Sequence, residues 1–272
     1  MLKPKTVKNI LDGSLRAMLH AARTVDGLIE RDPLVDIEWP RIVTPPANPF
    51  EADERDAILD WMKHRRFTFF TKPPMVRPHP PYHAFLHLLF WTGMRPSEAE
   101  ALDWEHIDLR RELAIVRQAQ SLGEINPTKT VSSDRAVELH PETVRLLSEM
   151  QPLRVHPRMP VFTDTKGGRI TFDNSLADHW NACLRALKIQ PRGVYACKDT
   201  FCSHMLSNGV DPLWMEKQTG VSWSTLRKHY ARWITRRDGR SNFALADPSL
   251  CIDDGSSRLE KGNFSTKFST KG

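Results

Sequence analysis

The stretch AFLHLLFWTGMRPSEAEALDW, residues 84–104, decides how the middle of the chain folds. Its first eight residues are almost all apolar, which is typical of a buried helix, and Gly93 predicts the end of that helix. Pro96 favours the start of a second, short helix. Arg95 is therefore expected in a tight turn between two helices. There it either presents its planar guanidinium to a phosphate or pairs with Glu98 at the surface.

A second stretch, VYACKDTF at residues 194–201, places Lys198 in a run that otherwise looks like the inner face of a helix. That helix is expected to close at Asn208-Gly209, and another turn is expected at Gly220. Tyr230 follows in RKHYARW. A tyrosine near a helix end is usually part of the core or of an interface, so Tyr230 alone does not indicate chemistry.

A third stretch, PTKTVSSDRAVEL at residues 127–139, carries Lys129 on a polar loop before a predicted strand. Residues 113–117 and 135–139 have the apolar and β-branched content of short strands. The segment between them is expected to be a hairpin loop or an added strand. Taken alone, Lys129 is most simply a solvated lysine.

Positive charge is concentrated towards the C-terminal half. The chain has 272 residues and a formal net charge of +6. Residues 182–240 hold eleven Lys or Arg against four Asp or Glu, a larger excess than that of the whole chain. Such a segment is either a solvated basic face or a surface for nucleic acid.

Composition argues against several other classes. The longest apolar runs are too short to span a bilayer, and the N-terminus has no secretory signal pattern. The cysteines at 183, 197, 202 and 251 form no C-x-x-C pair, which favours reduced thiols in the cytoplasm. Cys197 and Cys202 do not share a helix face, so a zinc site is not expected.

The remaining pattern predicts a mainly α protein with a small antiparallel β-sheet. Helical spacing runs through residues 5–30 and is followed by a proline-rich linker, and further helices are expected at 51–64, 141–150, 171–188, 195–209, 211–220 and 223–234. Residues 72–81 are expected to be a proline-rich loop. The domains are expected at 1–42, a helical fragment, and 43–236, with a flexible C-terminal tail at 237–272.

In this order and spacing, the three stretches resemble the tyrosine recombinase family, the integrases of phages and mobile elements. The first arginine box of that family has the form TG-x-R-x-x-E, which TGMRPSE matches. Its second box has the form H-x-x-R-H-T-F and reads YACKDTF here. Gly220-Val221 followed by Tyr230 matches its last box, and Lys129 before DRAVEL matches its hairpin lysine. The resemblance covers residues 46–234.

The resemblance implies a site-specific recombinase that breaks DNA through a 3′-phosphotyrosine link. Tyr230 would be the nucleophile, Arg95 would clamp the phosphate, and Lys129 would protonate the leaving 5′-oxygen. Lys198 stands at the second arginine position and Tyr195 where the family often has His. In supporting positions, Glu98 would orient Arg95, and Val221 stands where His or Trp is usual.

The resemblance also implies the partners. They are double-stranded DNA at attachment sites and three further copies of the chain in a tetramer on DNA, in the cytoplasm of a bacterial host and without a membrane. Arg192, Arg227 and Lys228 are candidate DNA contacts in the basic segment. No cofactor is expected, because side-chain cations stabilise the phosphate and the bond energy is conserved. Residues 1–42 resemble the end of a core-binding domain that is normally longer, so the chain looks N-terminally short.

Three substitutions leave two interpretations open. Lys198 keeps a charge but loses the bidentate fork, Tyr195 is a poor proton carrier at neutral pH, and Val221 donates no hydrogen bond. One interpretation is a working recombinase with a variant site. The other is a catalytically impaired DNA-binding prophage remnant or accessory factor.

Overall fold

The computed structural model describes residues 4–35, 37, 46–69, 75–121, 123–127, 134–151, 156–172 and 176–233. The chain divides into two compact units, Met1–Pro46 and Ala47–Gly272, and each is described by itself. Lys129, Cys251 and the predicted tail at 237–272 lie outside the described residues.

The first unit is helical, as its apolar spacing predicts. Helix α1, Pro4–Lys8, continues into a π-helical segment, Asn9–Leu15, and then into α2, Arg16–Thr24. None of these three elements contains a buried residue, so within them the helix face is not covered by a core.

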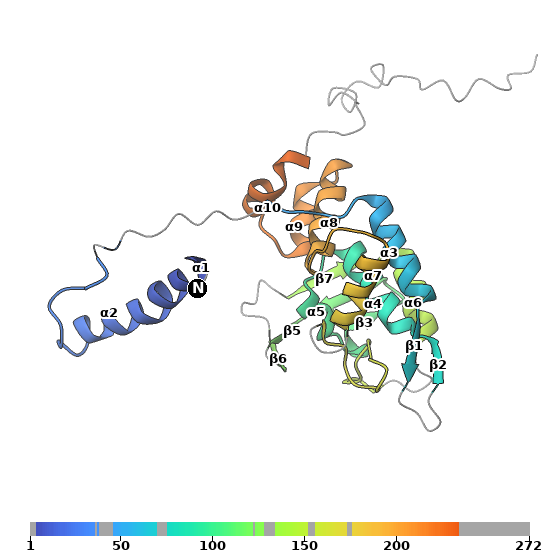
Figure 1. Ribbon diagram of the computed structural model, residues 1–272, viewed down its shortest axis with the longest axis horizontal. Coiled ribbons are helices and arrows are strands. Elements are labelled where there is room, and N and C mark those ends of the chain that lie inside the picture. The colour runs from blue at the N-terminus through green and yellow to red at the C-terminus, as the bar shows by residue number, and fades with distance from the viewer. Residues whose placement is uncertain are drawn as a thin grey trace, which may run out of the picture. The chain divides into compact units, whose positions relative to one another are not determined.

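Helix α4, Pro80–Thr92, is the centre of the second unit. Ten of its 13 residues are buried, which confirms the buried helix predicted from its apolar run. Helices α3 (Ala52–His64), α6 (Pro141–Met150) and α8 (Ala196–Ser207) all pack against it (Figure 1). Burial of this many apolar side chains supplies the main stabilising term of the domain.

Gly93 ends α4 and leads directly into α5, Pro96–Glu100. Its φ of 65° lies in the left-handed region, which favours glycine. A Cβ at this position would also lie 2.4 Å from Cδ1 of Phe201, so no larger residue fits. The predicted turn before Pro96 therefore has both a conformational and a packing cause.

A three-stranded antiparallel sheet has the order β3-β4-β7, formed by Ile107–Asp108, Leu113–Val116 and Arg135–Glu138. The 3₁₀ turn Trp104–His106 leads into β3. Strands β5 (Gln118–Ser121) and β6 (Glu124–Pro127) form a separate antiparallel hairpin. The two predicted strands are confirmed, and the segment between them supplies the added strands.

The expected loop over residues 72–81 is wrong for part of its length. Arg66–Phe69 and Met75–Pro78 form an antiparallel pair, β1 and β2, seen at one end of the domain in Figure 1. Phe67 and Phe69 are buried while every residue of β2 is exposed, so β2 is an edge strand. An edge strand tolerates Pro78, which is why the prolines were misleading.

The C-terminal part is helical, with α7 (Ala177–Ala186), α8, α9 (Pro212–Thr219), α10 (Trp223–Tyr230) and a 3₁₀ turn, Ala231–Trp233. A second apolar cluster joins α8, α9 and α10; it includes Phe201, Leu206, Met215, Leu226, Tyr230 and Trp233. Helix α7 lies within the predicted range 171–188, of which residues 173–175 are outside the described part of the chain. No helix in the described ranges is long and apolar enough to cross a membrane.

Candidate active site

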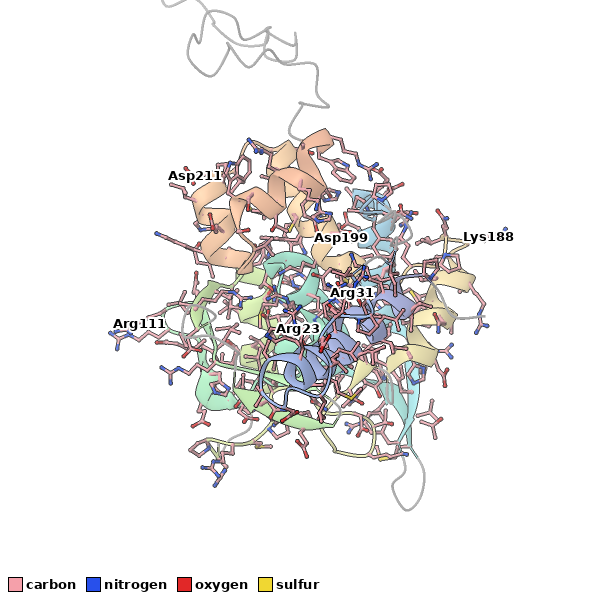
Figure 2. The ribbon with its side chains drawn as sticks, turned by 90° about the vertical axis from the view of Figure 1, so that its left-hand side faces the viewer. Arg23, Arg31, Arg111, Lys188, Asp199 and Asp211 are labelled. Atoms are coloured by element: carbon pink, nitrogen blue, oxygen red, sulfur yellow. The ribbon has the colours of Figure 1, made fainter. Side chains whose placement is uncertain are left out.

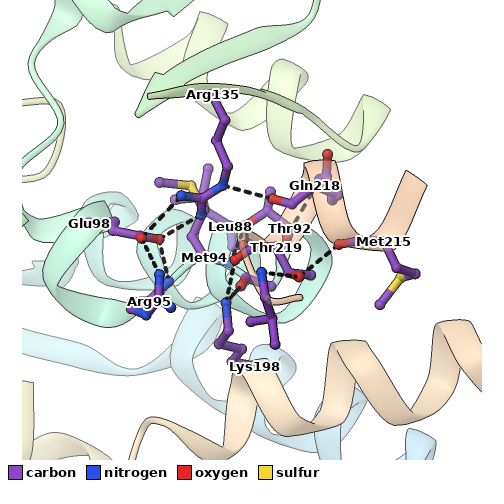
Figure 3. Close-up of polar contacts among 12 residues, drawn as sticks. Leu88, Thr92, Met94, Arg95, Glu98, Arg135, Lys198, Met215, Gln218 and Thr219 are labelled. Atoms are coloured by element: carbon purple, nitrogen blue, oxygen red, sulfur yellow. Dashed lines mark hydrogen bonds and ion pairs between the residues drawn. The ribbon is translucent and has the colours of Figure 1, made fainter. Parts of the chain in front are cut away.

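Glu98, in the first turn of α5, is shared between two arginines (Figure 3). Nη1 of Arg95 donates to Oε1 of Glu98 at 2.8 Å, and Nη2 of Arg135 donates to Oε2 at 2.7 Å. Burial favours a higher pKa for Glu98, but the hydrogen bonds and charge of Arg135 outweigh it and hold the pKa at about 2. The carboxylate is therefore ionised and fixes both guanidinium groups.

Of the two alternatives considered for Arg95, the pairing with Glu98 is present, and the phosphate contact stays a prediction. Arg95 pairs with Glu98, yet 41% of its side chain stays exposed. Arg135, by contrast, is largely buried and directs its remaining Nε to the carbonyl of Gln218 at 3.1 Å. Arg95 thus keeps N–H donors available to a ligand. Arg135 connects the carboxylate of Glu98 to the end of α9.

Lys198 lies inside the protein, with 1% of its surface exposed. Its Nζ donates to the carbonyl of Gly93 at 2.6 Å and to that of Thr219 at 2.8 Å. These carbonyls belong to the C-terminal ends of α4 and α9, where a cation is favoured. Burial lowers the pKa of Lys198 to about 8. In this arrangement the ammonium joins the ends of two helices. Its positive charge also acts on the nearby carboxylate of Glu98.

Gln218 fastens α9 to the sheet. Its side-chain amide donates to the carbonyl of Glu138 at 2.9 Å and accepts from the backbone N–H of Glu138 at 2.9 Å. The helix then ends at Gly220, which has a φ of 63°. A Cβ at Gly220 would lie 3.1 Å from Nη1 of Arg135, so this turn is also closely packed.

Tyr230 is buried at the end of α10, with 6% of its surface exposed. Its hydroxyl donates to Oδ1 of Asp199 on α8 at 2.5 Å. The thiol of Cys202 lies close enough to the same hydroxyl to act on it electrostatically. Burial, Cys202 and Asp199 together raise the pKa of Tyr230 well above its ordinary value, so the phenol is protonated.

Tyr195 stands at the start of α8 and is 49% exposed. Its hydroxyl interacts with the guanidinium of Arg95, and burial raises the pKa of Tyr195 while Arg95 opposes the rise. An open cleft of about 660 Å³ lies beside the pair; it is lined by Arg95, Pro96, Ser97, Glu100, Gln120, Gly123, Thr171, Phe172, Val194 and Tyr195. The two exposed donors thus face a space that a ligand can enter.

The other residues singled out from the sequence fall in different places. Val221 is half-buried and packs against the second apolar cluster, which includes Tyr230. The side chain of Arg192 is only 12% exposed, and its guanidinium pairs with Glu54 at 2.6 Å and lies 4.5 Å from the ring centre of Phe50. Its contacts are therefore structural ones. Lys129 lies outside the described residues.

Exposed basic side chains occur both on α10, which carries Tyr230, and at the edges of the domain. Arg227 and Lys228 are exposed on α10, which ends at Tyr230. Arg111 and Lys188 extend outward from the edges of the domain (Figure 2). Among the described residues, no group of three or more His, Cys, Asp or Glu is placed to hold a metal ion.

Sequence reasoning missed three residues that complete the site: Arg135, Asp199 and Gln218. Arg135 was visible in DRAVEL and Asp199 in YACKDTF, but each partner lies far away in the sequence. Glu98 is 37 residues from Arg135, and Tyr230 is 31 residues from Asp199. The sequence did offer one signal for Asp199. It is a polar residue in a helix whose neighbouring positions, 196–198 and 200–203, are buried.

The chain matches the Phage integrase family over residues 52–235. It is 25% identical over 169 residues to the prophage integrase IntR of Escherichia coli K12, a match that covers 53% of this chain and 41% of that protein. It is 22% identical over 188 residues to the putative defective protein IntQ of the same strain, covering 59% and 47%. The matched region is thus less than half the length of either relative.

Solved structures show the same fold. The Tn1549 transposon integrase, in complex with a circular intermediate DNA, superposes with a TM-score of 0.66 and 18% identity, covering 84% of this chain and 76% of that one. The XerA recombinase superposes with a TM-score of 0.51 and 16% identity, covering 90% and 79%. The mainly α architecture with small antiparallel sheets is confirmed by these neighbours.

Replacing Glu98 by Gln is expected to destabilise the domain by about 3 kcal/mol at neutral pH, since its pKa falls from 4.5 to about 2 on folding. A lowered carboxyl pKa stabilises the protein above its unfolded-state value and loses that effect as pH falls. The gap between wild type and Glu98→Gln should therefore narrow from pH 4.5 towards 2, measured by urea unfolding. The matched control is Glu105→Gln, an exposed carboxylate. Equal stability of Glu98→Gln and the control at neutral pH contradicts the shared-carboxylate account.

Replacing Lys198 by Met is expected to cost about 2–4 kcal/mol, because two buried carbonyls lose their donor. Lys198→Arg should also lose stability, since a guanidinium needs more room than an ammonium between Gly93 and Thr219. Thermal unfolding measures both, with the exposed Lys217→Met on α9 as control. A Lys198→Met protein as stable as the control would show that the hydrogen bonds from Lys198 to Gly93 and Thr219 do not stabilise the domain.

Proposed function

The chain belongs to the phage integrase family, and on that premise we propose that it cuts and rejoins duplex DNA at specific sites through a 3′-phosphotyrosine intermediate. The observation that carries the proposal is the position of Tyr230. Its hydroxyl is held by α8, the helix whose first turn sets Tyr195 beside Arg95. Helix α8 therefore contacts the proposed nucleophile through Asp199, and its N-terminal residue Tyr195 lies beside Arg95.

In this proposal Tyr230 attacks the scissile phosphate and the 5′-oxygen leaves. The transition state places extra negative charge on the non-bridging oxygens, so fixed cations supply most of the stabilisation. Arg95 is the exposed cation, oriented by Glu98. Lys198 adds positive charge near Arg95, because its ammonium is bonded to the carbonyl of Gly93. Lys129 remains the proposed acid for the leaving oxygen.

The variant residues are compatible with such a site. Tyr195 has a hydroxyl that can donate to a phosphate where the family often has His, and this half-exposed residue lines the cleft together with Arg95. Val221 contributes packing to the cluster around Tyr230. These features support a working site over a DNA-binding remnant.

The proposed substrate is double-stranded DNA carrying attachment sites, bound by four copies of the chain. The basic excess of residues 182–240 supports a DNA partner, as do the DNA complexes of the Tn1549 integrase. Residues 1–42 are proposed as part of a core-binding domain, and 43–236 as the domain that breaks and rejoins DNA.

Tyr230→Phe is expected to abolish covalent attachment to a nicked suicide duplex while DNA binding persists, because only the attacking oxygen is removed. The assay is a denaturing gel of protein and labelled DNA, with binding followed by gel shift. Tyr195→Phe is the matched comparison and should still form the adduct, at a reduced rate. Absence of any adduct with the wild-type chain would instead support the DNA-binding remnant.

Removing the charges of Arg227 and Lys228 together is expected to weaken DNA binding for all sequences and to lower the salt slope by about 2. The charge-matched control is the double Ala variant of Arg111 and Lys188, which extend from the domain edges. Fluorescence anisotropy at several salt concentrations measures the slope. If the salt slope of DNA binding is equal for the two double variants, Arg227 and Lys228 on α10 do not contact DNA.

A further inference from the structure

The phenol of Tyr230 is bonded to an acceptor that the family pattern did not supply. Oδ1 of Asp199 accepts from it at 2.5 Å, at a position where the second box of the family has His. Hydrogen bonds to a carboxylate are shorter and stronger than neutral ones. This contact fixes the direction of the hydroxyl proton and leaves a lone pair of the phenol oxygen for another bond.

We propose that Asp199 is the proton acceptor for Tyr230 in DNA cleavage, an inference that rests on the proposed function. The Tyr230 oxygen bonds to phosphorus, its proton passes to Oδ1 of Asp199, and the bond from phosphorus to the 5′-oxygen breaks. The departing 5′-oxygen takes a proton from the acid of the site. On rejoining, Asp199 returns its proton to the phenol.

The neighbouring groups are less suited to this role. Burial raises the pKa of Cys202 to about 11, so its thiol stays neutral near pH 7 and is no base. The ring of His229 is centred 6.5 Å from that of Tyr230 and is not hydrogen-bonded to it within the described contacts. Tyr195 carries its own proton, because its pKa is raised by burial.

The electrostatic surroundings allow Asp199 to accept a proton and release it again. Burial raises its pKa, while the hydrogen bond from Tyr230 and the charges of Lys198 and His229 oppose the rise. The titratable groups coupled to it are Tyr195 at the start of α8, Cys197, Lys198 and Cys202 in α8, and His229 and Tyr230 in α10. A carboxyl whose pKa is raised is a better base than an ordinary one.

The test measures the rate of adduct formation on a nicked suicide duplex in a single turnover, from about pH 4 to 8. Asp199→Asn keeps the shape of the side chain and is expected to lower the rate by about 10²–10⁴. The wild-type rate should fall as pH drops and Asp199 becomes protonated, whereas the variant should lack this acidic limb. Asp178→Asn, an exposed carboxylate on α7, is the matched control.

A second measurement does not depend on turnover. In ¹³C-labelled protein, the Tyr230 resonance, assigned with Tyr230→Phe, should titrate at lower pH in Asp199→Asn than in wild type. A variant that cleaves as fast as wild type or faster overturns the inference, because Asp199 then only restrains the tyrosine. A slower variant that keeps the acidic limb, or an unshifted Tyr230 titration, overturns it as well. A wild-type chain that forms no adduct contradicts the proposed function first, and this inference with it.

Discussion

The ammonium of Lys198 is the contact on which the candidate site depends. It joins the last carbonyls of two helices that are otherwise separated in the chain by more than 100 residues, α4 and α9. Both helices end in a glycine with positive φ, so both carbonyls point out of their helices at a defined place. Arg95 follows the first glycine by two residues, and α10 with Tyr230 follows the second. One buried cation therefore fixes the spacing between the turn that carries Arg95 and the end of α9, which α10 with Tyr230 follows.

A second constraint is the distribution of charge around Glu98. Its carboxylate is divided between Arg95 and Arg135, and Lys198 lies close enough to lower its pKa further. These three cations exceed the charge of Glu98, so the site carries a positive excess that a phosphate can neutralise. An arginine held in this way needs little reorganisation when the ligand arrives, which is the condition for electrostatic catalysis.

The sequence was sufficient for local features and insufficient for distant ones. The apolar run before Gly93, the proline at the start of α5 and the two sheet strands were predictable because each signal lies within a few residues. The pair of strands β1 and β2 was not predicted, since β2 is an exposed edge strand with a proline and its sequence resembles a loop. Lys198 was expected to meet phosphate, yet its partners are backbone carbonyls, which leave no trace in the side-chain sequence. The pairing of Asp199 with Tyr230 also required the packing of α8 against α10.

We expect the oxygen of Tyr230, whose hydroxyl is bonded to Asp199 on α8, to become covalently bonded to DNA. Peptide mass spectrometry of the complex trapped on a nicked suicide duplex tests it most directly. A single modified peptide, carrying a nucleotide 3′-phosphate on Tyr230, is expected. Attachment to any other residue, or recovery of Tyr230 unmodified from a covalent complex, would contradict it.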